Sequence, residues 1–307
     1  MTMIVRDALP EDMSRITQVR RAALPFLVET PESLLAQVRN AAPAGRRRMF
    51  VVEQDGEILG AGHAGIAHDG IEPGQAFATP VIHPDHRGRG AGTLMLRAAE
   101  EHVAAEGATT LFAWVLDRPE CRAFAERRGY RPGRAARFQR LDLARAALPE
   151  APAALPPGVE LRTAADYAAD PRPLYEADAE AVLDEPSDIP SEFDSYEEWL
   201  DSTWRNPLLD HRLSSVVTVD GRVAAFTAAH TDGRSRYLSG MTGTMRAYRG
   251  RGLAKLAKAD SLRRARAAGY TEAITHNDEG NAPMLAVNTW FGYEFFAGEV
   301  RHVRTVG

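Results

Sequence analysis

The chain contains only one cysteine, Cys121, among its 307 residues. An intramolecular disulfide and a zinc site built on several cysteines are therefore excluded, which agrees with a reducing cytoplasm. No apolar run approaches the roughly 20 residues of a membrane span. The first residues, "MTMIVRDALPED", also lack the basic and then apolar pattern of a signal peptide. We therefore expect a cytoplasmic protein that does not enter membranes.

An excess of positive charge is also missing. The chain has 37 basic and 42 acidic residues, which gives a formal net charge of −5. This balance argues against a general nucleic-acid binder, because such proteins usually present a basic face. Apolar residues make up 44% and charged residues 26%, which is ordinary for a globular protein, and the length suggests about two domains.

Two pairs of similar segments point to an internal duplication. The segment "HRGRGAG" begins at His86, and "YRGRGLA" begins at Tyr248, 162 positions later. The segments "VVEQDGEILGAGHA" and "VVTVDGRVAAFTAA" each read as a β-hairpin around an Asp-Gly turn, at Asp55 and at Asp220. Landmarks repeated at nearly constant spacing indicate two homologous halves.

A third landmark fixes the extent of the halves. "RRGY" ends at Tyr130 and "WFGY" ends at Tyr293, and an Ala- and Pro-rich segment lies between the halves. We predict a first domain over 1–145, a linker over 146–157 and a second domain over 158–307. Each half alternates strands with helical segments, which predicts an α/β fold with a mixed sheet.

The glycine-rich turns have the composition of an anion site. Each follows an apolar strand and precedes a helical pattern, and its glycines allow positive φ angles and close backbone approach. A helix start also offers unpaired N–H groups and the positive end of the helix dipole, which suits a pyrophosphate. Arg87, Arg89, Arg249 and Arg251 would add charge-assisted bonds. The alternative is an ordinary strand-to-helix turn with solvated arginines. The occurrence of the motif at the same place in both halves argues against this alternative.

Two other phosphate-binding motifs do not fit these turns. A Walker loop requires Gly-Lys-Ser/Thr after its glycines, and neither copy has it. A Rossmann fingerprint follows the first strand of its domain, whereas these turns follow several strands and a hairpin.

The pattern R-x-x-G-x-G/A after an apolar strand resembles the acyl-CoA pyrophosphate loop of the GNAT N-acetyltransferase superfamily. The matching residues are Arg87, Gly90 and Gly92 in the first half and Arg249, Gly252 and Ala254 in the second. With two such halves the chain resembles bacterial tandem GNAT proteins, a group that includes mycothiol synthase. The resemblance is strongest over 77–130 and 240–293.

This resemblance implies acetyl-CoA as the acyl donor, with its pantetheine arm between two splayed strands. An amine would attack the thioester directly, without a covalent enzyme intermediate and without a metal. The acyl-CoA-binding residues that it implies are Ile82, His83, Arg87, Gly88, Arg89, Gly90, Ala91, Gly92, Thr244, Met245, Arg249, Gly250, Arg251, Gly252, Leu253 and Ala254.

The sequence departs from the family pattern at two places. Many members carry a Tyr that protonates the leaving thiolate, but Ala125 and Asn288 stand at the corresponding positions. Asn288 is a weak catalytic candidate because an amide offers only a weak hydrogen bond. Mycothiol-synthase-like enzymes also use a carboxylate on the strand before the loop. "GQAFATPVI" and "YLSGMTGTM" contain none, which argues against mycothiol synthase itself.

The second half keeps more of the family's cleft residues. "THNDEGNAPMLAVNTWFGY" resembles a tandem-GNAT signature, which Asn277, Asn281, Met284 and Asn288 match. The resemblance suggests that Asn281 binds a pantetheine amide, whereas helix capping and turn chemistry are the alternative for these asparagines. The corresponding "DRPECRAFAERRGY" has no Asn. We therefore favour the second half as catalytic, with the first as a structural acetyl-CoA site or a second active site.

An acidic segment, residues 184–198, falls where the fold shapes an acceptor pocket. Asp184, Glu185 and Asp188 are our candidates for binding a cationic amine, and a solvated acidic loop is the alternative. His83 and His86 have H-x-x-H spacing but lack the further ligands of a zinc site, so we predict no metal. Cys121 has no neighbours that would activate a thiolate.

We therefore predict an acetyl-CoA-dependent N-acetyltransferase acting on a small primary amine, such as an amino sugar, an aminoglycoside-like or a polyamine-like compound. A non-catalytic acyl-CoA-binding or regulatory protein, and a protein or peptide N-acetyltransferase, are the alternatives. The chain is expected to be a monomer or a homodimer.

Overall fold

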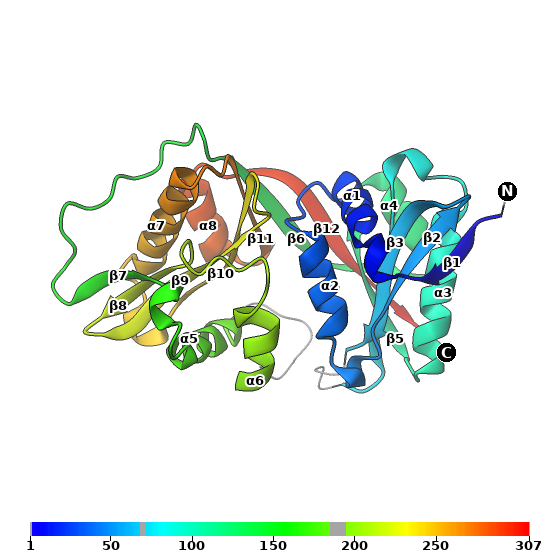
Figure 1. Ribbon diagram of the computed structural model, residues 1–307, viewed down its shortest axis with the longest axis horizontal. Coiled ribbons are helices and arrows are strands. Elements are labelled where there is room, and N and C mark those ends of the chain that lie inside the picture. The colour runs from blue at the N-terminus through cyan, green and yellow to red at the C-terminus, as the bar shows by residue number, and fades with distance from the viewer. Residues whose placement is uncertain (1, 68–71, 185–194, 307) are drawn as a thin grey trace. The chain divides into compact units, whose positions relative to one another are not determined.

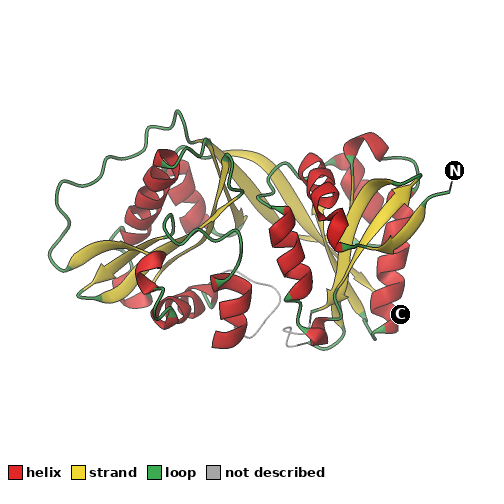
Figure 2. Ribbon diagram, viewed as in Figure 1, coloured by secondary structure: helices red, strands yellow, loops and turns green. Residues whose placement is uncertain are grey.

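The computed structural model describes residues 2–67, 72–184 and 195–306, and these form two compact units. The first unit contains residues 2–136 and 297–306, and the second contains 137–184 and 195–296. Each unit is a mixed sheet with helices on both faces (Figure 2), which confirms the predicted α/β fold. No helix in the described ranges is long and apolar enough to cross a membrane.

The first unit has the strand order β1-β2-β3-β4-β5-β12. Its strands are β1 (Ile4–Asp7), β2 (Arg48–Gln54), β3 (Glu57–Ile66), β4 (Gln75–Ile82), β5 (Thr110–Leu116) and the end of β12 (Glu294–Thr305). Its helices are α1 (Met13–Ala23), α2 (Pro31–Arg39), α3 (Ala91–Ala105) and α4 (Pro119–Glu126). Helices α1 and α2 pack through one core cluster, and α3 and α4 pack through another.

The second unit repeats this arrangement with the order β6-β11-β10-β9-β8-β7. Its strands are the end of β6 (Arg131–Asp142), β7 (Val159–Thr163), β8 (Ser215–Val219), β9 (Arg222–Thr231), β10 (Arg236–Thr244) and β11 (Glu272–Asp278). Its helices are α5 (Arg172–Val182), α6 (Tyr196–Trp199), α7 (Leu253–Ala267) and α8 (Ala282–Trp290). Figure 1 shows α5 and α6 on one side of these strands and α7 and α8 on the other.

The last strand of each sheet comes from the other half of the sequence. Strand β12 pairs antiparallel with β5 of the first unit, from Glu299 opposite Leu116 to Thr305 opposite Thr110 (Figure 1). Strand β6 in turn lies next to β11 of the second unit. The compact units therefore cross the sequence halves, and the linear boundaries at 145 and 158 stay a prediction about the duplicated segments.

Both predicted hairpins are present. Strand β2 pairs with β3, and β8 pairs with β9, through Asp-Gly turns in which both residues have positive φ. The φ angles are 53° and 81° at Asp55 and Gly56, and 49° and 77° at Asp220 and Gly221. These angles fit the type I′ turn, whose twist matches that of the paired strands.

Candidate functional site

Each glycine-rich turn forms a cradle between a strand and the start of a 15-residue helix. In the first unit β4 leads through a 3₁₀ turn, Pro84–His86, into α3, and in the second β10 leads through Arg246–Tyr248 into α7. The glycines before the helices have φ angles of 76°, 94°, 74° and 74° (Gly88, Gly90, Gly250 and Gly252). A Cβ at any of them would meet nothing within 4 Å, so these glycines serve backbone conformation.

The first arginine of each motif braces its own cradle. Arg87 Nε donates to the carbonyl oxygen of Ile82 at 3.3 Å, and Arg249 Nε donates to that of Thr244 at 3.1 Å. These bonds tie the turn to the last residue of the preceding strand. The second arginines, Arg89 and Arg251, are exposed. An open helix start beside an exposed guanidinium is the arrangement predicted for an anion site, and binding of an anion in either unit stays a prediction.

The strand that precedes each cradle separates from its parallel neighbour before it ends. Strand β4 pairs with β5 only from Gln75 to Phe77, although it continues to Ile82. Strand β10 likewise pairs with β11 only from Arg236 to Ser239, although it continues to Thr244. In each unit the two parallel strands therefore stop pairing before the cradle, and we call this unpaired stretch the split. The resemblance implies a pantetheine arm at this place.

The antiparallel ladder determines which backbone groups face the split. His83 donates its N–H to Leu59 of β3, and Met245 donates its N–H to Ala224 of β9, each at 2.9 Å. The preceding residues, Ile82 and Thr244, therefore belong to non-hydrogen-bonded pairs and turn their own N–H and C=O groups toward the split. The resemblance assigns the backbone that pairs with the arm to Ile82, His83, Thr244 and Met245, and of these four Ile82 and Thr244 have this orientation.

The two splits differ two residues earlier along the strand. In β10, Thr242 lies opposite Thr227 and, like Thr244, belongs to a non-hydrogen-bonded pair. Its N–H therefore also faces the split. In β4 the matching residue is Pro80, opposite Gly62, and proline has no N–H. Strand β10 also has a register shift between Ser239 and Thr242, whereas β4 pairs with β3 in regular register. The second split thus keeps a donor that the first one lacks.

A polar cluster lies beside the second split, with Lys258, Asn288 and Gln139 buried and Asn277 partly exposed. Lys258 Nζ is 2.6 Å from Asn288 Oδ1, and Asn288 Nδ2 is 3.1 Å from Gln139 Oε1 and 2.7 Å from Asn277 Oδ1. Lys258 and Asn288 have no exposed surface. Burial lowers the pKa of Lys258 to about 7. Both ends of the Asn288 amide are engaged here, and a catalytic role for it stays a prediction.

Sequence reasoning missed Lys258. The sequence sign that could have revealed it is a lysine on a face of α7 that is mostly apolar. The buried residues of that helix include Leu253, Ala257, Leu262 and Ala265. Asn281 is the N-cap of α8, where its Oδ1 accepts from the N–H of Met284 at 3.3 Å. That is the capping role considered as an alternative for it, and its contact with pantetheine remains a prediction.

Asp184 lies against the second cradle. Its carboxylate accepts hydrogen bonds from Arg246 at 2.9 and 3.1 Å and also from Arg249. These two guanidinium groups lower the pKa of Asp184 to about 2. Contact with an amine therefore stays a prediction for Asp184, while Glu185 and Asp188 lie outside the described residues.

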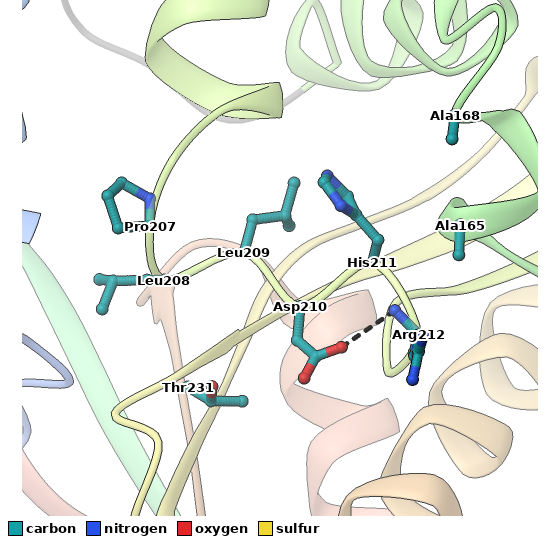
Figure 3. Close-up of a pocket in the computed structure, with 9 residues that line it drawn as sticks. All are labelled: Ala165, Ala168, Pro207, Leu208, Leu209, Asp210, His211, Arg212 and Thr231. Atoms are coloured by element: carbon teal, nitrogen blue, oxygen red, sulfur yellow. Dashed lines mark hydrogen bonds between the residues drawn. The ribbon is translucent and has the colours of Figure 1, made fainter.

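A shallow pocket of about 360 Å³ occurs elsewhere in the second unit (Figure 3). It lies at the loop before β8, where His211 packs on the ring of Trp204 with centroids 4.2 Å apart. Its lining includes no residue of the cradle or of the split, so it is separate from the candidate acyl-CoA site. Among the residues that the structure describes, no group of three His, Cys, Asp or Glu side chains could hold a metal.

Comparisons with known proteins agree with this geometry. Residues 14–130 match the model of the acetyltransferase (GNAT) family. A mycothiol acetyltransferase of Nocardia farcinica is 39% identical over 126 residues, which cover 41% of this chain and 39% of that protein. Another, from Segniliparus rotundus, is 28% identical over 87% of this chain and 98% of its own length.

Two solved structures have the same fold. A tandem GNAT protein from the clavulanic acid biosynthesis pathway covers 100% of this chain and 99% of its own, with a TM-score of 0.74 and 22% identity. A GCN5-related N-acetyltransferase from Sphaerobacter thermophilus covers 99% and 95%, with a TM-score of 0.70 and 23% identity. Residues 14–130 therefore match the acetyltransferase (GNAT) family, and the chain as a whole has the tandem-domain fold of these two structures.

Proposed function

We propose that the protein is an acetyl-CoA-dependent N-acetyltransferase that acts on a small primary amine, and that the reaction takes place in the second unit. The observation that carries this choice is the pair of strand amides, from Thr242 and Thr244, that face the split between β10 and β11. In the first unit Pro80 removes one donor of the matching pair.

The donors matter because charge develops on the thioester oxygen. When the amine nitrogen bonds to the carbonyl carbon, the carbonyl oxygen becomes an oxyanion. Backbone N–H groups held by a rigid strand stabilise that charge without reorganising. The C–S bond then breaks, the thiolate of coenzyme A takes a proton from water, and the amine nitrogen loses one.

The cradle over 249–254 would hold the pyrophosphate of coenzyme A. Its positive-φ glycines leave the first N–H groups of α7 open, and Arg251 is exposed beside them. An N–H cluster with one or two arginines is suited to a diphosphate of two negative charges. The first cradle has the same form, so we propose coenzyme A binding there without turnover.

The acceptor is a small amine, such as an amino sugar, an aminoglycoside-like or a polyamine-like compound. The relatives that are named mycothiol acetyltransferases support transfer of an acetyl group. The strands before both cradles, "GQAFATPVI" and "YLSGMTGTM", contain no carboxylate, which supports an enzyme other than mycothiol synthase itself.

A thiol-release assay over a panel of amines tests this proposal. We expect turnover with at least one amine, a loss of about tenfold or more with Arg249→Ala, and retained turnover with Arg87→Ala. The opposite pattern in the two variants would move the active site to the first unit.

The lack of the family's tyrosine, at both Ala125 and Asn288, supports one other function, a non-catalytic acyl-CoA-binding protein. Calorimetric binding of acetyl-CoA together with no thiol release on any amine would establish that function instead.

A further inference from the structure

We propose that Lys258 is a positioning residue, which acts through Asn288 to fix Asn277 as a hydrogen-bond donor to a carbonyl oxygen of acyl-CoA in the second split. This inference rests on the proposed function of the second unit.

The direction of every amide in the cluster follows from the lysine. Lys258 Nζ donates to Asn288 Oδ1 at 2.6 Å. In its ammonium form, which predominates below the pKa of about 7, lysine has three donors and no acceptor, so the Asn288 atom that it contacts must be the oxygen. The Asn288 nitrogen then points the other way, where it has two protons and two neighbouring oxygens. Those oxygens belong to Gln139 at 3.1 Å and Asn277 at 2.7 Å. An amide orientation that is otherwise ambiguous is thereby determined.

The Oδ1 atom of Asn277 therefore accepts the hydrogen bond from Asn288, and its Nδ2 group is left to donate to a ligand. Asn277 lies on β11 two residues beyond Thr275, the last residue that pairs with β10. It is the partly exposed member of the cluster, whereas Lys258, Asn288 and Gln139 are buried. The cluster therefore leads from the interior beneath α7 to the edge of the split.

The first unit shows that the fold does not require this cluster. The matching residues there are Leu96 on α3, Val115 on β5 and Ala125 on α4, and all three belong to one hydrophobic cluster. The same helices and strand thus pack through apolar side chains. A buried lysine costs stability because its charge leaves water. A local function at the second split accounts for a polar cluster that packing alone does not need.

A carbonyl oxygen of acyl-CoA is the ligand that this donor suits. The proposed binding mode places the pantetheine amides and the thioester between β10 and β11, and their carbonyl oxygens are acceptors. Without Lys258, the Asn288 amide can rotate and present its oxygen to Asn277. Asn277 would then turn its nitrogen inward and its oxygen toward the ligand, where it would repel a carbonyl group.

The test is a double-mutant cycle on acetyl-CoA binding, measured by calorimetry in the full-length protein without an amine. Every variant is made in an Arg87→Ala background, which weakens the proposed site of the first unit so that the measured affinity reports on the second. Lys258→Met and Asn277→Asp should each weaken binding by about 3- to 10-fold, the effect of one hydrogen bond. Because one acts through the other, the double variant should bind no more weakly than Asn277→Asp alone. Leu96→Met, at the matching site of the first unit, should leave binding unchanged.

Unchanged affinity in folded Lys258→Met, or additive losses in the double variant, would overturn the proposal. If Lys258→Met does not fold, Asn277→Asp and Asn277→Ala still test the donor at the partly exposed end of the cluster, and unchanged affinity in both would also overturn it.

Arg249→Ala separates this result from failure of the proposed function. Weakened binding there with unchanged binding in the cluster variants rejects only the role of Lys258. Unchanged binding in Arg249→Ala rejects the acyl-CoA site of the second unit.

Discussion

The two units share a framework and differ in what that framework presents. Both have a braced glycine cradle, a split between parallel strands and a 15-residue helix behind them. Beside the split, the first unit has a proline in its strand and an apolar cluster beneath its helix. The second unit has a strand amide and a buried lysine at these places. The parts of the predicted anion site are thus duplicated, whereas the parts that would act on a carbonyl group occur in one unit.

Exchanging the strand residues gives the largest expected effect. Thr242→Pro removes the N–H that faces the second split, and Pro80 shows that this register tolerates proline. Loss of one donor to a developing oxyanion lowers kcat by about 10²- to 10³-fold. Steady-state thiol release measures it, and Pro80→Thr should leave the rate unchanged. Equal activity of Thr242→Pro and the wild type, with unchanged melting curves, would remove the basis for assigning catalysis to the second unit.

Stability against pH should separate the two helices. Burial lowers the pKa of Lys258 to about 7 from 10.5, so between these values the unfolded chain holds a proton that the folded chain lacks. Unfolding free energy therefore rises with pH from 7 to 10, by up to about 1.4 kcal/mol per pH unit from this one group. Chemical denaturation at pH 7, 8, 9 and 10 measures the slope.

The comparison with variants isolates the contribution of the lysine. Lys258→Met should reduce the slope of unfolding free energy against pH by up to about 1.4 kcal/mol per pH unit, because methionine does not titrate. Leu96→Met, at the same place in α3, should leave it unaltered. A slope that is identical in Lys258→Met and the wild type would show that Lys258 keeps an ordinary pKa and is not buried in solution.

The cradle glycines should give equal effects on stability and unequal effects on activity. Gly90 and Gly252 have φ angles of 94° and 74°, with open space where a Cβ would lie. Alanine at either position should cost about 1 kcal/mol in the free energy of unfolding because of backbone strain alone. Only Gly252→Ala should raise the KM for acetyl-CoA. A raised KM with Gly90→Ala instead would assign the working cradle to the first unit.

The cradles and hairpins could be predicted from sequence because their causes are local. Glycine at a positive φ and an Asp-Gly turn are determined by a few adjacent residues, and the duplication repeated each signal. The contacts that distinguish the units are not local. Pro80 can be read from the sequence, but only the register of β4 against β3 shows that its nitrogen faces the split and that a donor is lost there. Gln139 reaches Asn288 from 149 positions away, because β6 completes the sheet of the second unit. Sequence periodicity gave no sign of that strand exchange.

The ion pair at the second cradle gives the smallest expected effect. Asp184 bonds Arg246 and Arg249, so a diphosphate entering this cradle competes with a carboxylate for Arg249. Asp184→Asn removes that competing charge. Because exposed ion pairs contribute little in water, the affinity for acetyl-CoA should rise only about two- to threefold, and less at high salt. Asp85→Asn is the matched change, since Asp85 lies in the turn of the first cradle and is exposed. Titration at low and high salt measures both variants. A weaker affinity in Asp184→Asn would mean instead that the carboxylate holds Arg249 in its binding position, so that the arginine is oriented by its acidic neighbour as well as by the carbonyl of Thr244.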